Sequence, residues 1–266
     1  MYAAVILRQV ERQEAGQAMA IIFDLGLHSG DDTEFYLKKG FDVVAVEANP
    51  HLVAAAEQKF SNEVRMGRLT IVPYAIAPEA GKVRFYLNRT NTAWSSVYES
   101  WGSRKRGADI VEVIAITPRM LFEQYGIPYY LKIDLEGMDE AVMRALEYFD
   151  KPQYISFEGV GVPGFNLLAG YGYRKFAIVN QARVHTQKLP CPAKEGDYVD
   201  HVFMQGSSGS FGQELPVSWM SLEEATAERN RIDCLRRSVA DRFPNSESKR
   251  HEAMKAIGWF DMHASL

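Results

Sequence analysis

The chain has 266 residues, of which 47% are hydrophobic and 24% are charged. So long a chain of average polarity can bury a sizeable core, which excludes a disordered chain and a small disulfide-stapled scaffold. Lys and Arg number 30 against 34 Asp and Glu, a formal net charge of −4. This balance does not indicate a nucleic-acid or membrane-surface binder, so we expect a small-molecule ligand.

The cysteines and the apolar runs indicate the compartment. Cys191 and Cys234 lie far apart and outside any CxxC spacing, so we expect reduced thiols and no thiolate zinc site. Charges in residues 1–20 interrupt any signal-peptide core, and no apolar run approaches the ~20 residues that span a bilayer. The sequence therefore predicts a cytoplasmic protein with no membrane and no nucleic-acid partner. It is compatible with a homo-oligomer.

Buried-strand patterns alternate with helix patterns at the start of the chain. Residues 20–27, AIIFDLGL, form an apolar run with one acid near its end, typical of a strand buried on both faces. The following GDDTEFYLKKG begins with acids and ends with Lys-Lys-Gly, which are helix start and stop signals. Residues 42–49 repeat the strand pattern, and Pro50 suits the first turn of a second helix.

The middle and the end of the chain continue the alternation. We predict strands over 69–76, 82–87, 129–137, 154–160, 173–180 and 201–206, and helices over 117–126 and 138–149. Residues 88–109 are polar, lack periodicity and are too long for a plain connector. From residue 218 the sequence is helical in character, and its apolar tail is expected to pack back onto the core.

Strands that alternate with helices predict an α/β fold with a mostly parallel sheet and helices on both faces. In such sheets, ligands bind beyond the carboxyl ends of the strands. We divide the chain into one domain over 1–212, with a core of about 20–206, and a C-terminal helical extension over 213–266 that packs on the core.

The turn after the first strand has the pattern D-x-G-x-x-x-G, formed by Asp24, Gly26 and Gly30. A glycine there lets the backbone approach a ligand closely. His28 replaces the second glycine of the nicotinamide-binding pattern, and Asp31 places negative charge where a pyrophosphate would bind. A ligand with a cationic end and no phosphate, such as S-adenosylmethionine, suits this turn better. We assign these five residues to the predicted cofactor site.

Glu47 ends the second strand about 20 residues after Gly26, where a carboxylate can accept hydrogen bonds from both ribose hydroxyls. The alternative is a solvated acid at the end of a strand.

The segments FDLGLHSGDDTEFYL, VEANP and LKIDLEGMDEAVMRAL resemble the FkbM family of S-adenosylmethionine-dependent methyltransferases. The resemblance runs from about Ala20 to Gly206, and His28 departs from it because the family more often has Asn there. It implies the Rossmann-like class I methyltransferase fold, a seven-stranded sheet whose last strand is antiparallel. It also implies O-methylation of a small molecule. The cofactor residues that it implies are Asp24, Gly26, Gly30, Glu47 and Asn49, with Ala75 and Ile76 near the adenine.

Three acids near strand ends are the candidate catalytic groups. An unactivated hydroxyl must lose its proton to a base or a metal near the methyl group. Asp134 and Glu136 are two residues apart at one strand end, so their side chains share a face if the strand conformation continues to Glu136, and Glu158 ends the next strand. We expect Glu136 to act in catalysis, Asp134 to face the cofactor's ammonium, and no metal dependence. The alternative is that one acid positions the ammonium while the others cap helices or pair with Lys132.

Trp94, Ser95 and Ser96 in the polar stretch are expected to contact the methyl acceptor. The alternative is a surface loop with one anchoring Trp. The expected acceptor is a hydroxyl of a sugar, glycoside or polyketide-like product. Methylation of a carboxylate or nitrogen remains open, and so does a cofactor-binding protein without catalysis that partners another chain.

Overall fold

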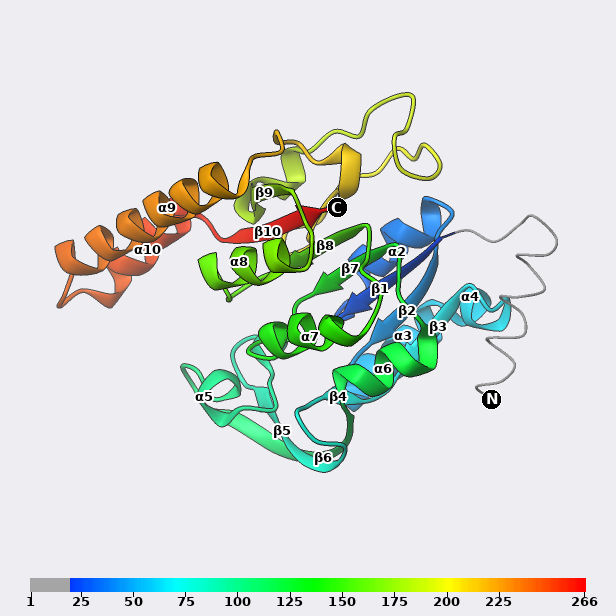
Figure 1. Ribbon diagram of the computed structural model, residues 1–266. Coiled ribbons are helices and arrows are strands. Elements are labelled where there is room, and N and C mark those ends of the chain that lie inside the picture. Colours follow the sequence, from blue (N-terminus) through cyan, green and yellow to red (C-terminus); the bar gives the residue numbers. More distant parts are fainter. Residues whose placement is uncertain (1–19) are drawn as a thin grey trace. The chain divides into compact units, whose positions relative to one another are not determined.

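The computed structural model describes residues 20–266 (Figure 1). The described chain divides into two compact units, of which the first ends at Ile155 and the second runs from Ser156 to Leu266. The predicted boundary after residue 212 falls inside the second unit. The prediction about a signal-peptide core concerns residues that lie outside the described part of the chain.

The first unit combines a parallel sheet with helices. Its strands are β1 (Ile21–Leu25), β2 (Asp42–Val46), β3 (Leu69–Val72), β4 (Ala75–Ile76), β5 (Gly81–Asn88), β6 (Ala108–Ile116) and β7 (Tyr130–Ile133). Its helices are α2 (Asp31–Lys38), α3 (Pro50–Lys59), α4 (Ser61–Arg65), α5 (Glu99–Gly102), α6 (Pro118–Tyr125) and α7 (Asp139–Ala145). Two 3-10 turns are η1 (Thr92–Trp94) and η2 (Leu146–Tyr148).

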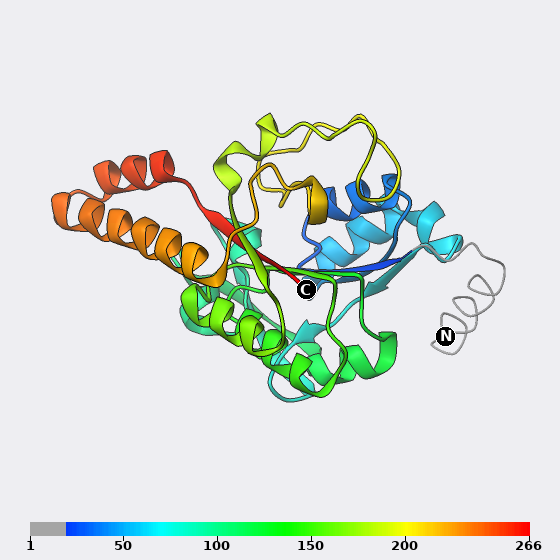
Figure 2. The ribbon, with the colours of Figure 1, turned by 45° about the horizontal axis from the view of Figure 1, so that its top comes forward.

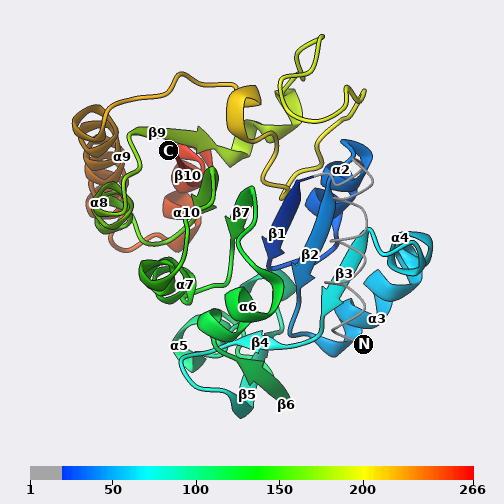
Figure 3. The ribbon, with the colours of Figure 1, turned by 45° about the vertical axis from the view of Figure 1, so that its right-hand side comes forward.

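Strands β3, β2, β1 and β7 lie side by side and parallel (Figure 3). Phe23 on β1 is in register with Leu131 on β7, and its ring stacks on Phe122 of α6 at 6.4 Å between centroids. The neighbouring Tyr130 points to the opposite face, where it meets Tyr36 of α2 at 5.8 Å. Helices α2 and α6 therefore cover opposite faces of the sheet, which explains why these strands carry apolar residues on both faces.

A separate three-stranded sheet has the order β4-β6-β5. The prediction of one strand over 69–76 is wrong, because Pro73 lacks an N–H for the ladder and the chain leaves the larger sheet after Val72. Residues 75 and 76 then pair with β6 instead. Strand β6 itself was missed, although its residues are in antiparallel register with β5 along its whole length.

In the second unit, one strand pairs with the C-terminal segment of the chain. It contains α8 (Val162–Gly170), β9 (Lys175–Asn180), η3 (Gln181–Thr186), η4 (Gly212–Glu214), α9 (Leu222–Arg242), α10 (Glu247–Ile257) and β10 (Phe260–Ser265). Helices α9 and α10 contact one another (Figure 2). Strand β10 runs antiparallel to β9, and β8 (Tyr154–Phe157) spans the division between the units.

Two predictions for this part of the chain are wrong. Residues 201–206 form no strand, and the C-terminal extension is not helical to its end, because residues 260–265 form β10. Gly258 ends α10 with φ of 93°, a conformation that favours glycine. A Cβ on Gly258 would also lie 2.2 Å from Oδ1 of Asn180. The chain therefore leaves the helix at this glycine and enters the strand.

The larger sheet has the strand order β3-β2-β1-β7-β8-β10-β9. The predicted α/β fold, with a mostly parallel seven-stranded sheet whose last strand is antiparallel, is confirmed. Both cysteines are free thiols, as predicted. Within residues 20–266, none of the helices combines the length and the hydropathy needed to cross a membrane.

His263 on β10 predicts a loss of stability in acid. Burial lowers the pKa of His263 to about 3, whereas an unfolded chain protonates a histidine near pH 6.5. As the pH falls from 7 to 4, protons bind the unfolded state and favour unfolding by up to about 1.4 kcal/mol per pH unit. Denaturant unfolding across this range should show a shallower pH slope in His263→Asn.

The matched control is His251→Asn, because His251 is exposed on α10. This control should keep the wild-type slope. An equal slope in His263→Asn and in the wild type would contradict the assignment.

Candidate cofactor and acceptor site

A buried lysine ties together the strand ends beneath the site. Nζ of Lys132 on β7 donates to Oδ1 of Asp24 at 2.9 Å and to the carbonyl of Gly26 at 3.2 Å. It also lies 3.5 Å from Oδ2 of Asp32 on α2. Burial opposes the charge, but Asp24, Asp32 and Asp134 outweigh it and raise the pKa of Lys132 well above its ordinary value. The ends of β1 and β7 are thereby held together by charge.

Gly26 allows the turn after β1 to pack against the turn after β7. Its φ is 98°, and a Cβ there would lie 2.2 Å from the carbonyl oxygen of Asp134. The glycine is therefore required by a close approach of two backbones. Gly30, also at positive φ, would place a Cβ 2.6 Å from the ring of Phe60, so its role in the structure is packing as well.

Glu47 connects the turns that follow β1 and β2. Its Oε2 accepts from the backbone N–H of His28 at 2.9 Å, and its Oε1 accepts from that of Asn49 at 2.8 Å. Burial raises the pKa of Glu47, and these backbone donors act in the opposite direction. Asn49 in turn caps α3 by accepting from the N–H of His51 at 3.0 Å. The acid is thus a buried, oriented carboxylate and not a solvated one.

A cavity open to solvent lies at this edge of the first unit, beyond the carboxyl ends of β1, β2 and β7. The predicted site residues that line it are Gly26, His28, Glu47, Ala75, Ile76, Ser95, Asp134 and Glu136. Further lining residues that the sequence analysis did not single out are Val46, Ala48, Tyr74, Phe85, Thr92, Ala93, Val97 and Leu135.

Several predicted site residues lie elsewhere. Asp24 is fully buried in the Lys132 network, and Asn49 is the cap of α3. Asp31 is near Lys59, with 3.6 Å between Oδ1 and Nζ. Glu158 follows β8 in the second unit, so its predicted convergence with the other acids stays a prediction. Within residues 20–266, no group of three His, Cys, Asp or Glu side chains is placed to hold a metal ion.

The turn after β7 presents two acids to the cavity. Burial raises the pKa of Asp134, and Lys132 counteracts this. Glu136 has φ of 46° and Gly137 has φ of 108°, so both adopt the left-handed region. Burial raises the pKa of Glu136 to about 7, against the opposing charge of Arg104. The turn therefore holds a carboxyl group that titrates near neutral pH.

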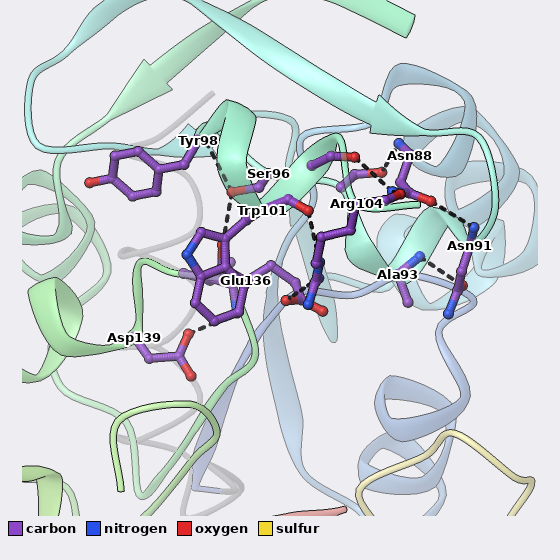
Figure 4. Close-up of polar contacts among 12 residues, drawn as sticks. Asn88, Asn91, Ala93, Ser96, Tyr98, Trp101, Arg104, Glu136 and Asp139 are labelled. Carbon is purple, nitrogen blue, oxygen red and sulfur yellow. Dashed lines mark hydrogen bonds and ion pairs between the residues drawn. The ribbon is translucent and has the colours of Figure 1, made fainter. Parts of the chain in front are cut away.

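Residues 88–107, which we call the insert, form an ordered segment between β5 and β6. The side-chain amide of Asn88 donates to the carbonyls of Gly102 at 2.7 Å and Arg104 at 2.9 Å. Its Oδ1 accepts from the N–H groups of Thr90 and Asn91 at 2.8 and 2.9 Å. Figure 4 shows this arrangement. One buried amide thus closes a loop whose sequence shows no periodicity.

The insert is attached to both turns that border the cavity. Nε2 of His28 lies 2.9 Å from Oγ1 of Thr92, and Oγ of Ser96 donates to the carbonyl of Glu136 at 2.8 Å. Ser95 lines the cavity, whereas Ser96 is buried. Trp94 does not line the cavity and instead lies beneath Lys105, whose Nζ is 4.4 Å from the ring centroid.

The donor set of the cavity fits S-adenosylmethionine. Three carboxylates line it, and within the described part of the chain no Lys or Arg does. A ligand with positive charge and no phosphate is therefore favoured. Glu47, Asp134, Ala75 and Ile76 all line the cavity, and their predicted contacts with the ribose, the ammonium group and the adenine stay predictions.

A family of known proteins matches much of the chain. The methyltransferase FkbM domain matches residues 24–166. No curated protein sequence matches the chain. A solved precorrin-6Y C5,15-methyltransferase from Geobacter metallireducens is 18% identical, with 60% of this chain and 66% of that chain covered and a TM-score of 0.35.

Two further structures are similar at lower identity. A phosphoethanolamine N-methyltransferase 2 from Haemonchus contortus, solved with S-adenosylmethionine, is 10% identical over 93% of this chain and 49% of that chain, with a TM-score of 0.37. A methyltransferase from Archaeoglobus fulgidus is 10% identical over 98% of this chain and 94% of that chain, with the same TM-score. The matched part of this chain thus spans about two thirds of the length of the Geobacter enzyme and about half of that of the Haemonchus enzyme.

The domain match covers more than half of the chain, and the chain belongs to the FkbM family of methyltransferases. It is an enzyme that uses S-adenosylmethionine as its methyl donor.

Replacing Lys132 by Met should destabilise the protein by about 3–5 kcal/mol, because Asp24 would remain buried without its cation. Denaturant unfolding measures this change. Lys82→Met is the matched control, since Lys82 pairs with Glu112 on an exposed surface, and its loss should change the free energy of unfolding little. Similar losses in the two variants would contradict a special role for Lys132.

Replacing Glu47 by Ala should weaken S-adenosylmethionine binding by roughly 1.5–3 kcal/mol, the range for hydrogen bonds to charged groups. Calorimetry would show this as a Kd raised about 10- to 150-fold. The thermal stability of the variant must be measured as well, because Glu47 also accepts two backbone hydrogen bonds. Glu57→Ala on the exposed side of α3 is the control. An unchanged Kd in folded Glu47→Ala would remove Glu47 from the ribose site.

Proposed function

We propose that this enzyme methylates a hydroxyl oxygen of a small metabolite, such as a sugar, a glycoside or a polyketide-like product. One observation carries the proposal: the carboxyl group of Glu136 lines the cavity and has a pKa of about 7. A base with a pKa near the working pH is the most effective proton acceptor. A hydroxyl needs such a base, whereas a carboxylate acceptor does not.

The residues of the cavity have distinct roles in this proposal. Bound S-adenosylmethionine supplies a methyl group on a positively charged sulfur, which keeps the electron pair of the broken C–S bond. Asp134 and Glu47 hold the ammonium and ribose groups, so that the acceptor oxygen can lie opposite the sulfur. Glu136 takes the hydroxyl proton as the new C–O bond forms. The insert, through Thr92, Ala93 and Ser95, covers the cavity and limits the access of water.

A panel of acceptors tests the proposed chemistry. The protein is incubated with S-adenosylmethionine and matched compounds that carry a hydroxyl, a carboxylate or an amine, and the methylated atom is identified by mass spectrometry and NMR. Methyl ethers as the products would support the proposal. Products methylated only at a carboxylate or at nitrogen would contradict it, and binding without turnover on any acceptor would favour a non-catalytic role.

Replacing Glu136 by Gln should lower kcat by about 10²- to 10⁴-fold, the usual contribution of a general base, and should change S-adenosylhomocysteine affinity much less. In the wild type, kcat/KM should rise as the pH increases through about 7, because only the ionised carboxylate accepts a proton. The variant should lose this rise. Steady-state kinetics between pH 5.5 and 8.5 measures both effects.

Glu140→Gln is the matched control for this variant. Glu140 is exposed on α7 and accepts from Arg144. It should retain wild-type kinetics. Normal turnover in Glu136→Gln would end the assignment of Glu136 as the base.

A further inference from the structure

Arg104 of the insert forms an ion pair with Glu136. Its Nη2 lies 2.6 Å from Oε2 of Glu136, and its Nε donates to the carbonyl of Trp101 at 2.8 Å. The guanidinium carbon lies 5.0 Å from the ring centroid of Trp101 and 5.3 Å from that of Trp94. Figure 4 shows Arg104 and Glu136 pointing toward one another. Two indole rings and one carbonyl thus define where the guanidinium lies.

We propose that Arg104 is a positioning residue that keeps Glu136 ionised and oriented along the cavity for methyl transfer. The catalytic part of this proposal rests on the proposed function of Glu136 as the base. The ion pair and its effect on Glu136 are independent of it.

The surroundings of Glu136 otherwise favour its neutral form. Burial raises its pKa, and the charge of Asp134 acts in the same direction. The other titratable residues that line the cavity are Tyr74, Glu47, which is acidic, and His28, whose pKa is lowered by burial. Within residues 20–266, Arg104 is the cation paired with Glu136. Its charge therefore opposes the burial of this acid.

The pair differs from an ordinary surface salt bridge. The side chain of Glu136 is only 14% exposed and that of Arg104 is 36% exposed, so solvent screens their attraction less than that of exposed charges. The carbonyl of Arg104 is itself fixed by the amide of Asn88 at 2.9 Å. A planar guanidinium can stack on two indoles and still donate in its plane, which an ammonium cannot do. The arrangement thus requires arginine in particular.

The insert also contacts the backbone of the turn that carries Glu136. Ser96 holds the carbonyl of Glu136 at 2.8 Å. A Cβ on Gly137 would lie 3.1 Å from Nε1 of Trp101 and 3.2 Å from the ring of Tyr98. Backbone and side chain of Glu136 are therefore held by the same segment, so the position of the carboxylate depends on the insert.

Titration of Glu136 by NMR tests the proposal without relying on activity. The side-chain carboxyl carbon is labelled in glutamate, and its signal is assigned by its loss in Glu136→Gln. The proteins compared are the wild type, Arg104→Met, Arg104→Lys and the control Arg106→Met, whose side chain belongs to an exposed residue two positions away. Thermal unfolding confirms that each is folded. The kcat/KM profile is then measured on the same proteins.

We expect the midpoint for Glu136 to rise by about one pH unit or more in Arg104→Met, since an adjacent arginine usually lowers a carboxyl pKa by that amount. Arg104→Lys should restore part of the difference, and Arg106→Met should match the wild type. At pH 7, Arg104→Met should then lose roughly fivefold or more in kcat/KM, because fewer molecules carry the carboxylate.

The two measurements separate the two proposals. An unchanged NMR midpoint in folded Arg104→Met would overturn the role of Arg104, and so would an equal rise in Arg106→Met. A raised midpoint with an unchanged kcat/KM profile would support the effect of Arg104 on Glu136 but would overturn Glu136 as the base. Parallel shifts of both would support both.

Discussion

The ion pair between Lys132 and Asp24 is the constraint on which the site depends. A lysine ammonium buried without a partner would be costly, so Nζ must stay within reach of the carboxylate at the end of β1. Thr33 on α2 donates to the other oxygen of Asp24 at 2.7 Å, which places the start of α2 as well. Because β1 and β7 are fixed at this depth, the turns carrying Gly26 and Asp134 meet at the edge of the cavity.

Charge is distributed unevenly around this cavity, and the imbalance suits its ligand. The lining is acidic, which favours a cationic donor but also makes ionisation of each acid harder. Lys132 compensates Asp134 from below, and Arg104 compensates Glu136 from the insert. Lys132 belongs to strand β7 of the sheet, whereas Arg104 belongs to the insert. In the proposed mechanism, the first cation supports cofactor binding and the second supports the base that acts on the acceptor.

Sequence reasoning found more of the cavity-lining residues at strand ends than in the insert. Gly26, Glu47 and Asp134 end buried strands, and the rule that ligands bind beyond the carboxyl ends of parallel strands applies to them without knowledge of packing. Asn88 and Arg104 carry no such signal. Their partners are decided by how a segment without periodicity folds back on itself, and a polar residue in such a stretch looks like any solvated one. The available signal was the spacing of Trp94, Trp101 and Arg104 within one polar segment, because an arginine can pack against indole rings.

The sequence by itself determined the α/β class, the strands β1, β2 and β7 and the cofactor class, because these follow from local patterns of apolar residues, turns and acids, whereas the family followed from the resemblance of three segments. Only the tertiary structure decided which C-terminal segment became the antiparallel strand, since residues 201–206 and 260–265 both mix apolar and polar residues and only the second segment, β10, pairs with β9. It also decided that Asp24 binds Lys132. That pairing joins residues far apart in the chain, and a carboxylate at a strand end serves a ligand or a lysine depending on which of them the fold brings near.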